Sequence, residues 1–234
     1  MMIRYILTDI EGTTTDIAFV HQVLFPYAAQ HLPAFVQAHM ATDPVVRDCI
    51  YEAQQTLSLE EGITPDLDQM VAALLHWIRI DRKHPALKQL QGLIWREGYE
   101  TGGFRGHVYP DVAPQLRQWR AQGLSIGIYS SGSVAAQRLL FGYSEEGDLT
   151  NLFDHYFDTA VGHKREEVSY QSIAKALNLN PKQILFLSDV EAELDAAQAA
   201  GMHTLQLLRP GTAASTRHAT ATNFYSIDVE RIIK

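Results

Sequence analysis

Two acidic side chains near the start of the chain form its first candidate site for chemistry. Asp9 and Glu11 are separated by one residue and follow an apolar run over residues 3–8. In an extended segment, residues two apart point to the same side, so both carboxyl groups can face one pocket. Gly12 then permits a sharp change of direction. Taken alone, this segment is explained equally well as an acidic turn without chemistry.

A cluster of small hydroxyl residues follows a second apolar run. Residues 125–129 predict a strand, and Ser130, Ser131 and Ser133 come directly after it, around Gly132. Hydroxyl groups and backbone N–H groups at the start of a helix form a cradle for an anion. Capping of the next helix by Ser131 or Ser133 is the more common role of such residues. Ser130 and Ser131 are therefore candidate anion ligands, with capping as the alternative.

A lysine and a further acid follow two more strand-like segments. Lys164 comes after residues 156–158, where its ammonium group could pair with a carboxylate and a phosphate. A solvated surface lysine is the usual alternative, and Arg165 is a second cation that could act instead. Asp189 follows the apolar run 184–187 and could bind a hard cation through oxygen. Its alternative role is to cap the helix that follows.

The elements that must position these residues alternate between strands and helices through the second half of the chain. Strands are expected at 125–129, 184–187 and 204–208, with helices over 134–141 and 190–200. This alternation predicts an α/β fold, a Rossmann-like parallel sheet with helices on both faces. In such open sheets ligands bind beyond the carboxyl ends of the strands, which is where all four polar signals lie.

Three shorter segments carry weaker expectations. Asn180 followed by Pro181 predicts the start of a helical turn, with a cap and a proline at the first helical position. Residues 209–223, rich in Thr and Ala, are expected to form a surface loop. Residues 226–233 are expected to form a short closing helix.

The first half differs, because one strand at 3–8 is followed only by helical periodicity. The economical arrangement is a helical insertion of residues 16–103 into an α/β core of residues 1–15 and 104–234. Gly102 and Gly103 would provide a hinge at its end. Four helices are predicted within the insertion, over residues 19–40, 45–57, 67–81 and 85–99.

Composition limits the classes of function. The chain has 234 residues, of which 46% are apolar and 20% charged, the balance of a globular protein. Its net charge of −8 without a basic stripe argues against nucleic-acid binding. No apolar run is long enough to cross a membrane, and the first residues lack the features of a signal peptide. Cys49 is the single cysteine, so no intrachain disulfide can form. We therefore expect a cytoplasmic protein.

The joint order of the four polar signals is more specific than any one of them. An acid pair ends the first strand, hydroxyls end a later strand, a lysine follows, and an acid ends the next apolar strand. In this order the chain resembles the haloacid dehalogenase superfamily of phosphohydrolases, whose pattern is Asp-X-Asp-Gly-Thr, then Ser/Thr, then Lys, then an acidic motif. The helical insertion falls where one subclass of that superfamily carries its cap domain.

The resemblance implies a role for each acid. Asp9 would attack phosphorus and form an aspartyl-phosphate. One Mg²⁺ ion per subunit would be bound by Asp9, by Glu11 through its backbone carbonyl, and by Asp189. Glu11 stands where the superfamily has a second aspartate, usually the general acid and base. Glu193 stands where many relatives have another acid, and it would stabilise the metal site without binding the metal directly.

The remaining polar residues would handle the phosphate. Ser130 and Ser131, with neighbouring N–H groups, would hold its oxygens together with Lys164. Lys164 would also be catalytic, because its ammonium group would stabilise charge on the phosphoryl group during transfer.

The glutamate at position 11 narrows the resemblance. The run from Asp9 to Val20 is similar to that of the enolase-phosphatases, also called acireductone synthases, of methionine salvage. The stretches 95–99, 106–112 and 129–133 are similar as well. The resemblance implies a small phosphorylated diketone as substrate, 2,3-diketo-5-methylthiopentyl 1-phosphate. The enzyme would enolise it and then remove the phosphate to give the acireductone. We expect it to act as a monomer.

Two features of this reaction stay open. The base that removes the carbon-bound proton could be Glu11, Glu97 or His107. The methylthio group would need an apolar pocket, although packing inside the helical insertion is the stronger explanation for its candidate residues, which are Phe19, Val20, Leu24 and Phe25.

Three alternative functions remain. A sugar-phosphate phosphatase of the same superfamily is the nearest, because fold and motifs do not define the leaving group. A carbon–halogen hydrolase needs the nucleophile but no metal, whereas Glu11 and Asp189 argue for a metal. A phosphorylated signalling receiver uses similar residues, but its aspartate follows a later strand and it has no cap.

Overall fold

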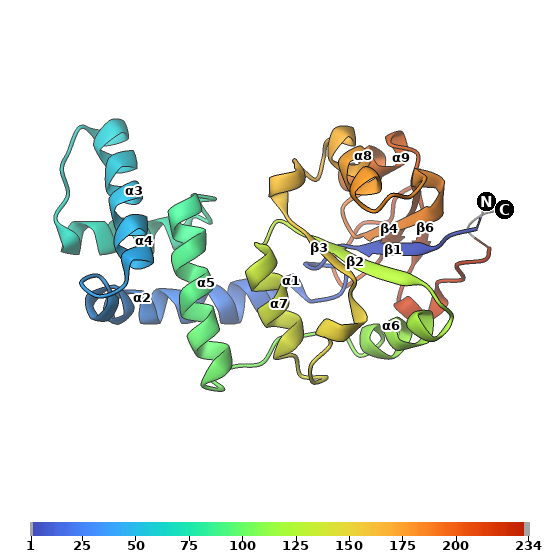
Figure 1. Ribbon diagram of the computed structural model, residues 1–234, viewed down its shortest axis with the longest axis horizontal. Coiled ribbons are helices and arrows are strands. Elements are labelled where there is room, and N and C mark those ends of the chain that lie inside the picture. Colours follow the sequence, from blue (N-terminus) through green and yellow to red (C-terminus); the bar gives the residue numbers. More distant parts are fainter. Residues whose placement is uncertain (1, 232–234) are drawn as a thin grey trace. The chain divides into compact units, whose positions relative to one another are not determined.

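The computed structural model describes residues 2–231, and the chain divides into two compact units (Figure 1). The core unit comprises Met1–Ile17 and Arg105–Lys234, and the helical unit comprises Ala18–Phe104. The predicted division of roles, a catalytic core of residues 1–15 and 104–234 and a cap of residues 16–103, stays a prediction, because compactness alone does not assign a role.

The core unit is built on a parallel sheet, as the alternation of strands and helices predicts. Within residues 2–231 the sheet has six strands in the order β3-β2-β1-β4-β5-β6. All neighbouring pairs are parallel, and β1 lies between β2 and β4, with Leu7 opposite both Gly127 and Phe186. The strands are β1 (Tyr5–Thr8), β2 (Ser125–Tyr129), β3 (His155–Phe157), β4 (Ile184–Ser188), β5 (His203–Leu207) and β6 (Ala219–Ala221).

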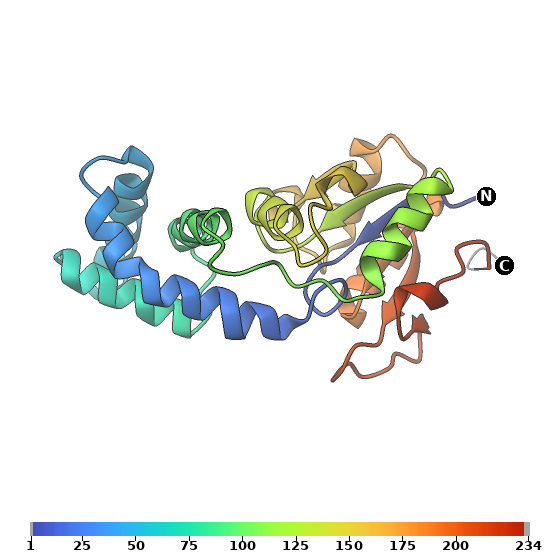
Figure 2. The ribbon, with the colours of Figure 1, turned by 90° about the horizontal axis from the view of Figure 1, so that it is seen from below.

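Helices cover both faces of this sheet. Strand β1 leads to its neighbour β2 and then to β3 on one side, whereas β4 leads to β5 on the other. Because parallel crossovers are right-handed, connections that run in opposite directions place their helices on opposite faces. Figure 1 and Figure 2 show α6 on one face and α8 with α9 on the other. The helices are α6 (Val112–Ala121), α7 (Val134–Gly142), α8 (Glu167–Ala176) and α9 (Glu191–Ala199).

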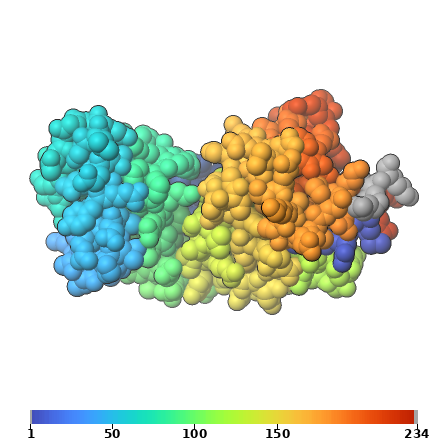
Figure 3. Space-filling model, turned by 45° about the horizontal axis from the view of Figure 1, so that its top comes forward, coloured from blue at the N-terminus to red at the C-terminus, as the bar shows by residue number. Residues whose placement is uncertain are grey.

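Alternation along the strands supplies the apolar surface for both layers. Tyr5 and Leu7 of β1 pack with the residues of α8 and α9, so Ile6 between them points to the opposite face. In the space-filling view of Figure 3, the orange surface of α8 and α9 covers the first of these faces. The buried cluster on that side also contains Tyr129, Phe157, Tyr170, Ile173, Ala174, Ile184, Phe186, Leu194, Ala196, Ala197, Ala200 and Met202.

The helical unit has its own apolar core. Leu32, Leu74 and Leu90, from three of its helices, belong to one fully buried cluster with Trp77. Asp66 and Gln69 form a reciprocal capping box at the start of α4, with hydrogen bonds of 2.9 and 3.0 Å. The helices are α1 (Ile17–Phe19), the π-helical turn η1 (Val20–Leu24), α2 (Phe25–His39), α3 (Pro44–Glu61), α4 (Leu67–Arg79) and α5 (Pro85–Glu100).

Short 3-10 turns complete the chain. They are η2 (Thr150–Leu152), η3 (Thr159–Val161), η4 (Pro181–Gln183) and η5 (Phe224–Ser226). The predicted turn at Asn180 is confirmed, since its side chain accepts a hydrogen bond from the backbone N–H of Lys182 at 3.0 Å. Among residues 2–231, no helix has the length and apolar character needed to cross a bilayer.

Two sequence predictions for the last segment are wrong. Residues 209–223 are not only a surface loop, because β6 lies within them and Arg209 is buried. The closing helix expected over residues 226–233 does not form in its described part, where the 3-10 turn η5 ends at Ser226 and turns follow. Residues 232 and 233 lie outside the described chain. A three-residue edge strand carries too few residues for its periodicity to be recognised.

Tyr5 generates a prediction about the sheet. Its ring passes over Gly127, and its hydroxyl makes a 3.1 Å hydrogen bond with Nδ1 of His155 on β3. A Cβ at position 127 would lie 2.1 Å from that hydroxyl oxygen. Gly127→Ala should therefore lower the free energy of unfolding by about 1–3 kcal/mol. In a Tyr5→Phe background the added cost should be smaller. Urea unfolding of the four proteins measures this, and an equal cost in both backgrounds would contradict it.

Candidate active site

The site begins where the sheet changes direction. Strands β1 and β4 are neighbours, but their connections leave toward opposite sides, which opens a crevice at their carboxyl ends. Asp9 directly follows β1, and Asp189 directly follows β4. The N–H of Asp9 donates to the carbonyl of Leu187 at 2.9 Å, which continues the ladder between the two strands by one residue. The fold thus brings together two acids that are distant in the sequence.

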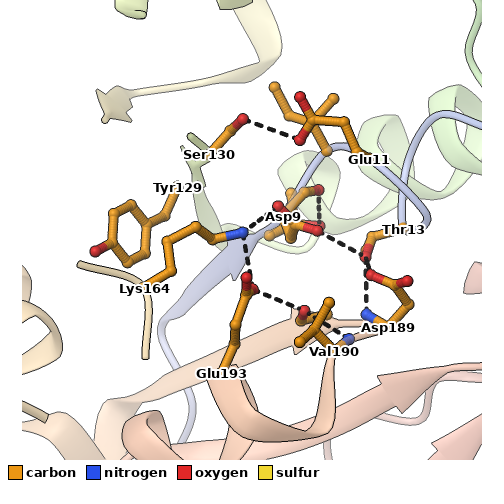
Figure 4. Close-up of polar contacts among 12 residues, drawn as sticks. Asp9, Glu11, Thr13, Tyr129, Ser130, Lys164, Asp189, Val190 and Glu193 are labelled. Carbon is orange, nitrogen blue, oxygen red and sulfur yellow. Dashed lines mark hydrogen bonds and ion pairs between the residues drawn. The ribbon is translucent and has the colours of Figure 1, made fainter. Parts of the chain in front are cut away.

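A buried ion-pair network surrounds Asp9 (Figure 4). The ammonium group of Lys164 donates to Oδ1 of Asp9 and lies 2.8 Å from Oε2 of Glu193. Asp9 is 2% exposed and Lys164 is 5% exposed. The hydroxyl of Tyr170 donates to the carbonyl of Lys164 at 2.6 Å, which holds the lysine main chain. The predicted pairing of Lys164 with a carboxylate is therefore confirmed, and its alternative as a solvated surface lysine is wrong.

Thr13 lies between the two strand-end acids. Its Oγ1 is 3.3 Å from Oδ2 of Asp9 and 3.4 Å from Oδ1 of Asp189, and it accepts the N–H of Asp189 at 3.0 Å. A hydroxyl has one hydrogen, so it can donate to only one of these carboxylates at a time. Gly12 adopts a φ of +77°, and a Cβ there would lie 2.3 Å from Oδ2 of Asp189. The absence of a side chain lets the Asp189 carboxylate lie against the turn.

Glu11 points toward a different neighbour. The hydroxyl of Ser130 donates to Oε2 of Glu11 at 3.1 Å and accepts the N–H of Gly132 at 3.1 Å (Figure 4). Ser133 accepts the N–H of Ala136 at 3.2 Å and therefore caps α7. The structure thus separates the serines: Ser130 faces Glu11, and the expected capping falls to Ser133.

The carboxyl groups of the site crowd one another. Burial, and then the charge of Asp9, raise the pKa of Glu11, raise that of Asp189 to about 6, and raise that of Glu193 to about 7. Burial lowers the pKa of Lys164, but the carboxylates of Asp9 and Glu193 outweigh it and hold the ammonium group in its charged form. Lys164 therefore pairs with two of these four carboxyl groups, Asp9 and Glu193.

This donor set fits a hard divalent cation. Asp9 and Asp189 present carboxylate oxygens on both sides of Thr13, and oxygen is what Mg²⁺ prefers. The Glu11 side chain hydrogen-bonds Ser130 rather than joining them. Accordingly, the described part of the chain contains no group of three or more His, Cys, Asp or Glu side chains able to hold a metal. Further ligands would have to come from the main chain or from water.

The other sequence candidates are spread over both units. His107, in the core unit, accepts the N–H of Asp16 at Nδ1, 3.1 Å away, and its carbonyl accepts the hydroxyl of Thr15. In the helical unit, Glu97 is exposed on α5, and Phe25 stacks on Trp95 with ring centroids 6.5 Å apart. The remaining pocket candidates of that unit, two buried and one half-buried, are Phe19, Leu24 and Val20.

Sequence reasoning missed a second buried ion pair near the site. The guanidinium group of Arg209 binds both carboxylate oxygens of Asp111, at 3.0 and 2.9 Å. Its Nε donates to the carbonyl of Thr13 at 3.0 Å. Arg209 stood in a segment expected to be a surface loop, and no local pattern connects it with an aspartate 98 residues away.

Comparison with known proteins agrees with this geometry. The sequence model of the haloacid dehalogenase-like hydrolases matches residues 3–201. The protein named enolase-phosphatase E1 of Citrobacter koseri is 51% identical over 232 residues, which cover 99% of this chain and 100% of that relative. The chain belongs to the enolase-phosphatase E1 family of haloacid dehalogenase-like hydrolases. The family resemblance carried by the acid pair, the serines, the lysine and the second acid is therefore confirmed.

Solved structures support the same fold. The UTR4 protein of Saccharomyces cerevisiae has a TM-score of 0.79 and is 36% identical, over 96% of this chain and 100% of that one. The L-2-haloacid dehalogenase RSc1362 has a TM-score of 0.58 at 20% identity, over 99% of both chains. The second likeness shows a shared fold alone. The predicted α/β core with an inserted helical unit is confirmed in this enolase-phosphatase E1 family member.

The turn at Gly12 generates a stability prediction with a matched control. Gly12 and Gly123 both lie in the core unit with positive φ, +77° and +82°, but only Gly12 has Asp189 against its Cα. Both Gly→Ala variants should lose about 1–2 kcal/mol to the left-handed backbone. Gly12→Ala should lose roughly 1–3 kcal/mol more, because the methyl group displaces the Asp189 carboxylate. Urea unfolding measures both, and equal losses would show that the contact is harmless.

Proposed function

We propose that this protein enolises 2,3-diketo-5-methylthiopentyl 1-phosphate and then hydrolyses its phosphate ester to give the acireductone of methionine salvage. The observation that carries the proposal is the group Asp9, Lys164 and Asp189 at the switch point of the sheet, in a chain 51% identical to an enolase-phosphatase E1 over its whole length. A sugar-phosphate phosphatase stays the nearest alternative.

Asp9 is the proposed nucleophile. One of its carboxylate oxygens would form a bond to phosphorus while the bond from phosphorus to the enol oxygen breaks, which leaves an aspartyl-phosphate. Lys164 orients this carboxylate through Oδ1, and the Thr13 hydroxyl contacts Oδ2. Both side chains are held before substrate arrives, so little reorganisation is needed for the attack.

Asp9, Asp189 and the backbone carbonyl of Glu11 are the proposed ligands of Mg²⁺. The excess of carboxylate oxygens over cations at this place supports that assignment. When bound, Mg²⁺ would neutralise charge on the phosphoryl oxygens and so reduce their repulsion of the nucleophile. The Glu11 side chain is not proposed as a ligand, because its carboxyl group is engaged by Ser130.

Lys164 and two serines are the proposed phosphate-binding residues. The ammonium group of Lys164 has three donors, and Asp9 and Glu193 use two of them in the structure. Ser130 is the first residue after β2, where its hydroxyl accepts the N–H of Gly132, and Ser131 is exposed beside it. Their hydroxyl groups would donate to phosphate oxygens.

Glu11 is the proposed acid and base of the phosphatase step. Burial and the neighbouring Asp9 raise the pKa of Glu11, which favours the protonated form that a proton donor needs. It would give this proton to the departing enol oxygen. It would then take a proton from the water that attacks the aspartyl-phosphate, and so return to its starting form.

The enolisation step precedes the phosphatase step and needs a base of its own. Glu11, Glu97 and His107 remain its candidates. We propose that the helical unit serves as a cap that excludes water during this step. A monomeric cytoplasmic enzyme without nucleic-acid or membrane partners is the proposed setting.

Asp9→Asn tests the covalent mechanism. The amide keeps the size of the side chain but is a poor nucleophile, so phosphate release should fall by on the order of 10⁴-fold or more. Enol formation and phosphate release from the diketo phosphate should be followed separately, by absorbance and by a phosphate assay, with and without Mg²⁺. Phosphate release at the wild-type rate would exclude Asp9 as nucleophile. Urea unfolding checks that the variant folds.

Glu11→Gln tests the proton transfer. The amide oxygen can still accept the Ser130 hydroxyl, but the side chain can no longer give or take a proton at neutral pH. Phosphate release should slow by about 10²–10⁴-fold, with a smaller change in KM. Enol formation measured in the same variant decides whether Glu11 is also the enolisation base. A wild-type phosphatase rate would assign the acid role elsewhere.

A further inference from the structure

Arg209 is held by several polar and aromatic partners at once. All three guanidinium nitrogens donate: Nη1 and Nη2 to Asp111, at 3.0 and 2.9 Å, and Nε to the carbonyl of Thr13, at 3.0 Å. The Arg209 and Asp111 side chains are 7% and 10% exposed. The guanidinium carbon lies 4.0 Å from the ring centroid of Tyr109 and 5.6 Å from that of Phe224. Hydrogen bonds and aromatic rings together thus fix the position of the guanidinium group.

Asp111 is anchored as firmly as its partner. Besides accepting both guanidinium bonds, its Oδ2 accepts the N–H of Phe224 at 2.7 Å. A buried ion pair is weak support for stability, because apolar residues of similar volume often stabilise a fold equally well. What a bidentate pair supplies is a rigid planar geometry. This favours a positioning role for the pair.

Thr13 connects this pair with the acids of the site. Its carbonyl accepts from Arg209, and its hydroxyl contacts the carboxylates of Asp9 and Asp189 and accepts the Asp189 N–H (Figure 4). A shift of the Thr13 main chain therefore moves the hydroxyl that separates the two carboxylates. Groups that orient metal ligands from behind commonly change metal affinity or activity by about 10–100-fold when they are mutated.

We infer that Arg209, clamped by Asp111, is a positioning residue that acts through Thr13 to set the spacing of the Asp9 and Asp189 carboxylates for Mg²⁺. The inference rests on the proposed function, because it concerns the metal site proposed there. Arg209 touches neither carboxylate itself. It is distinct from the ion pairs of Lys164, which contact Asp9 directly.

Arg209→Lys is the informative variant. A lysine keeps the charge but has one nitrogen, so it cannot bind both Asp111 oxygens and the Thr13 carbonyl. Calorimetric titration of the full-length protein with Mg²⁺ alone should show a Kd raised by about 10–100-fold. Turnover at saturating Mg²⁺ should show a lower kcat with little change in KM, since no phosphate-binding residue is altered.

Thr13→Val shows whether the effect passes through Thr13. Valine is similar in size but lacks the hydroxyl, so the single Thr13→Val variant should already bind Mg²⁺ more weakly than the wild type. If Arg209 acts through that hydroxyl, Arg209→Lys should have little further effect on the Mg²⁺ Kd in the Thr13→Val background. Effects that multiply in the double variant would mean that Arg209 acts by another route and would overturn the inference.

The chain offers a control for the arginine-to-lysine change in Arg120. Its guanidinium group binds Asp154 at 2.6 Å and the carbonyl of Leu124 at 3.3 Å, while Asp154 accepts the N–H of Ile126. Like Arg209, Arg120 contacts an aspartate and a main-chain carbonyl, but it does so through Nη1 alone, in a partly exposed place at the opposite, amino end of β2. Arg120→Lys should leave the Mg²⁺ Kd and kcat unchanged.

The outcomes separate the inference from the proposed function. Wild-type protein that binds no Mg²⁺ would overturn both. Wild-type protein that binds Mg²⁺, with an unchanged Kd and kcat in Arg209→Lys, would overturn the inference alone. If Arg209→Lys does not fold, Asp111→Asn decides the question in the same assays. Its amide keeps the shape and can still accept from Phe224, but it lacks the charge, so the same rise in Mg²⁺ Kd is expected.

Discussion

Repulsion among carboxyl groups at the ends of β1 and β4 is the constraint on which the rest of the site depends. Asp9, Glu11, Asp189 and Glu193 lie close enough for their charges to interact, and the ammonium group of Lys164 pairs with two of them, Asp9 and Glu193. Burial first, and then the charge of Asp9, raises the pKa of Asp189 to about 6 and that of Glu193 to about 7, because buried charges of like sign repel strongly. The apolar layers of the sheet hold these groups together despite this repulsion. The excess of carboxyl groups suits a hard cation, which would offset their negative charge.

The topology explains how the chain brings these acids together without long loops. Because the connections from β1 and β4 leave in opposite directions, their carboxyl ends border one crevice, and the next residue of each strand is an aspartate. Gly12 and Thr13 then determine how closely the two side chains approach. The sheet topology brings Asp9 and Asp189 to the same edge, and Gly12 and Thr13 in one turn set the distance between their carboxyl groups. The helical unit begins at Ala18, shortly after this turn, so the nucleophile and the turn both belong to the core unit.

Much of this arrangement could be predicted from the sequence, and the limits have physical causes. Strong periodicity identified the central strands and the inserted helices, and the rule for parallel sheets placed Asp9 and Asp189 at one edge. The contact between Arg209 and Asp111 could not be predicted, because it joins residues 98 positions apart through side chains alone. The direction of the Glu11 side chain depends on rotamers and neighbours, which no residue pattern encodes. Strand β6 was missed because an edge strand of three residues lacks a distinct apolar face.

Glu11 shows how one extra methylene group changes the chemistry of a shared site. Its longer side chain accepts a hydrogen bond from the hydroxyl of Ser130, which directly follows β2. That hydroxyl has one hydrogen, and under the proposed function a bound phosphate competes with Glu11 for it. A carboxylate that loses a donor becomes a stronger base, so phosphate binding would raise the pKa of Glu11 further. Substrate would thereby favour the protonated form of Glu11, and the proton would be available when the ester bond breaks. Under the proposed function, the protonation of Glu11 would thus respond to the substrate.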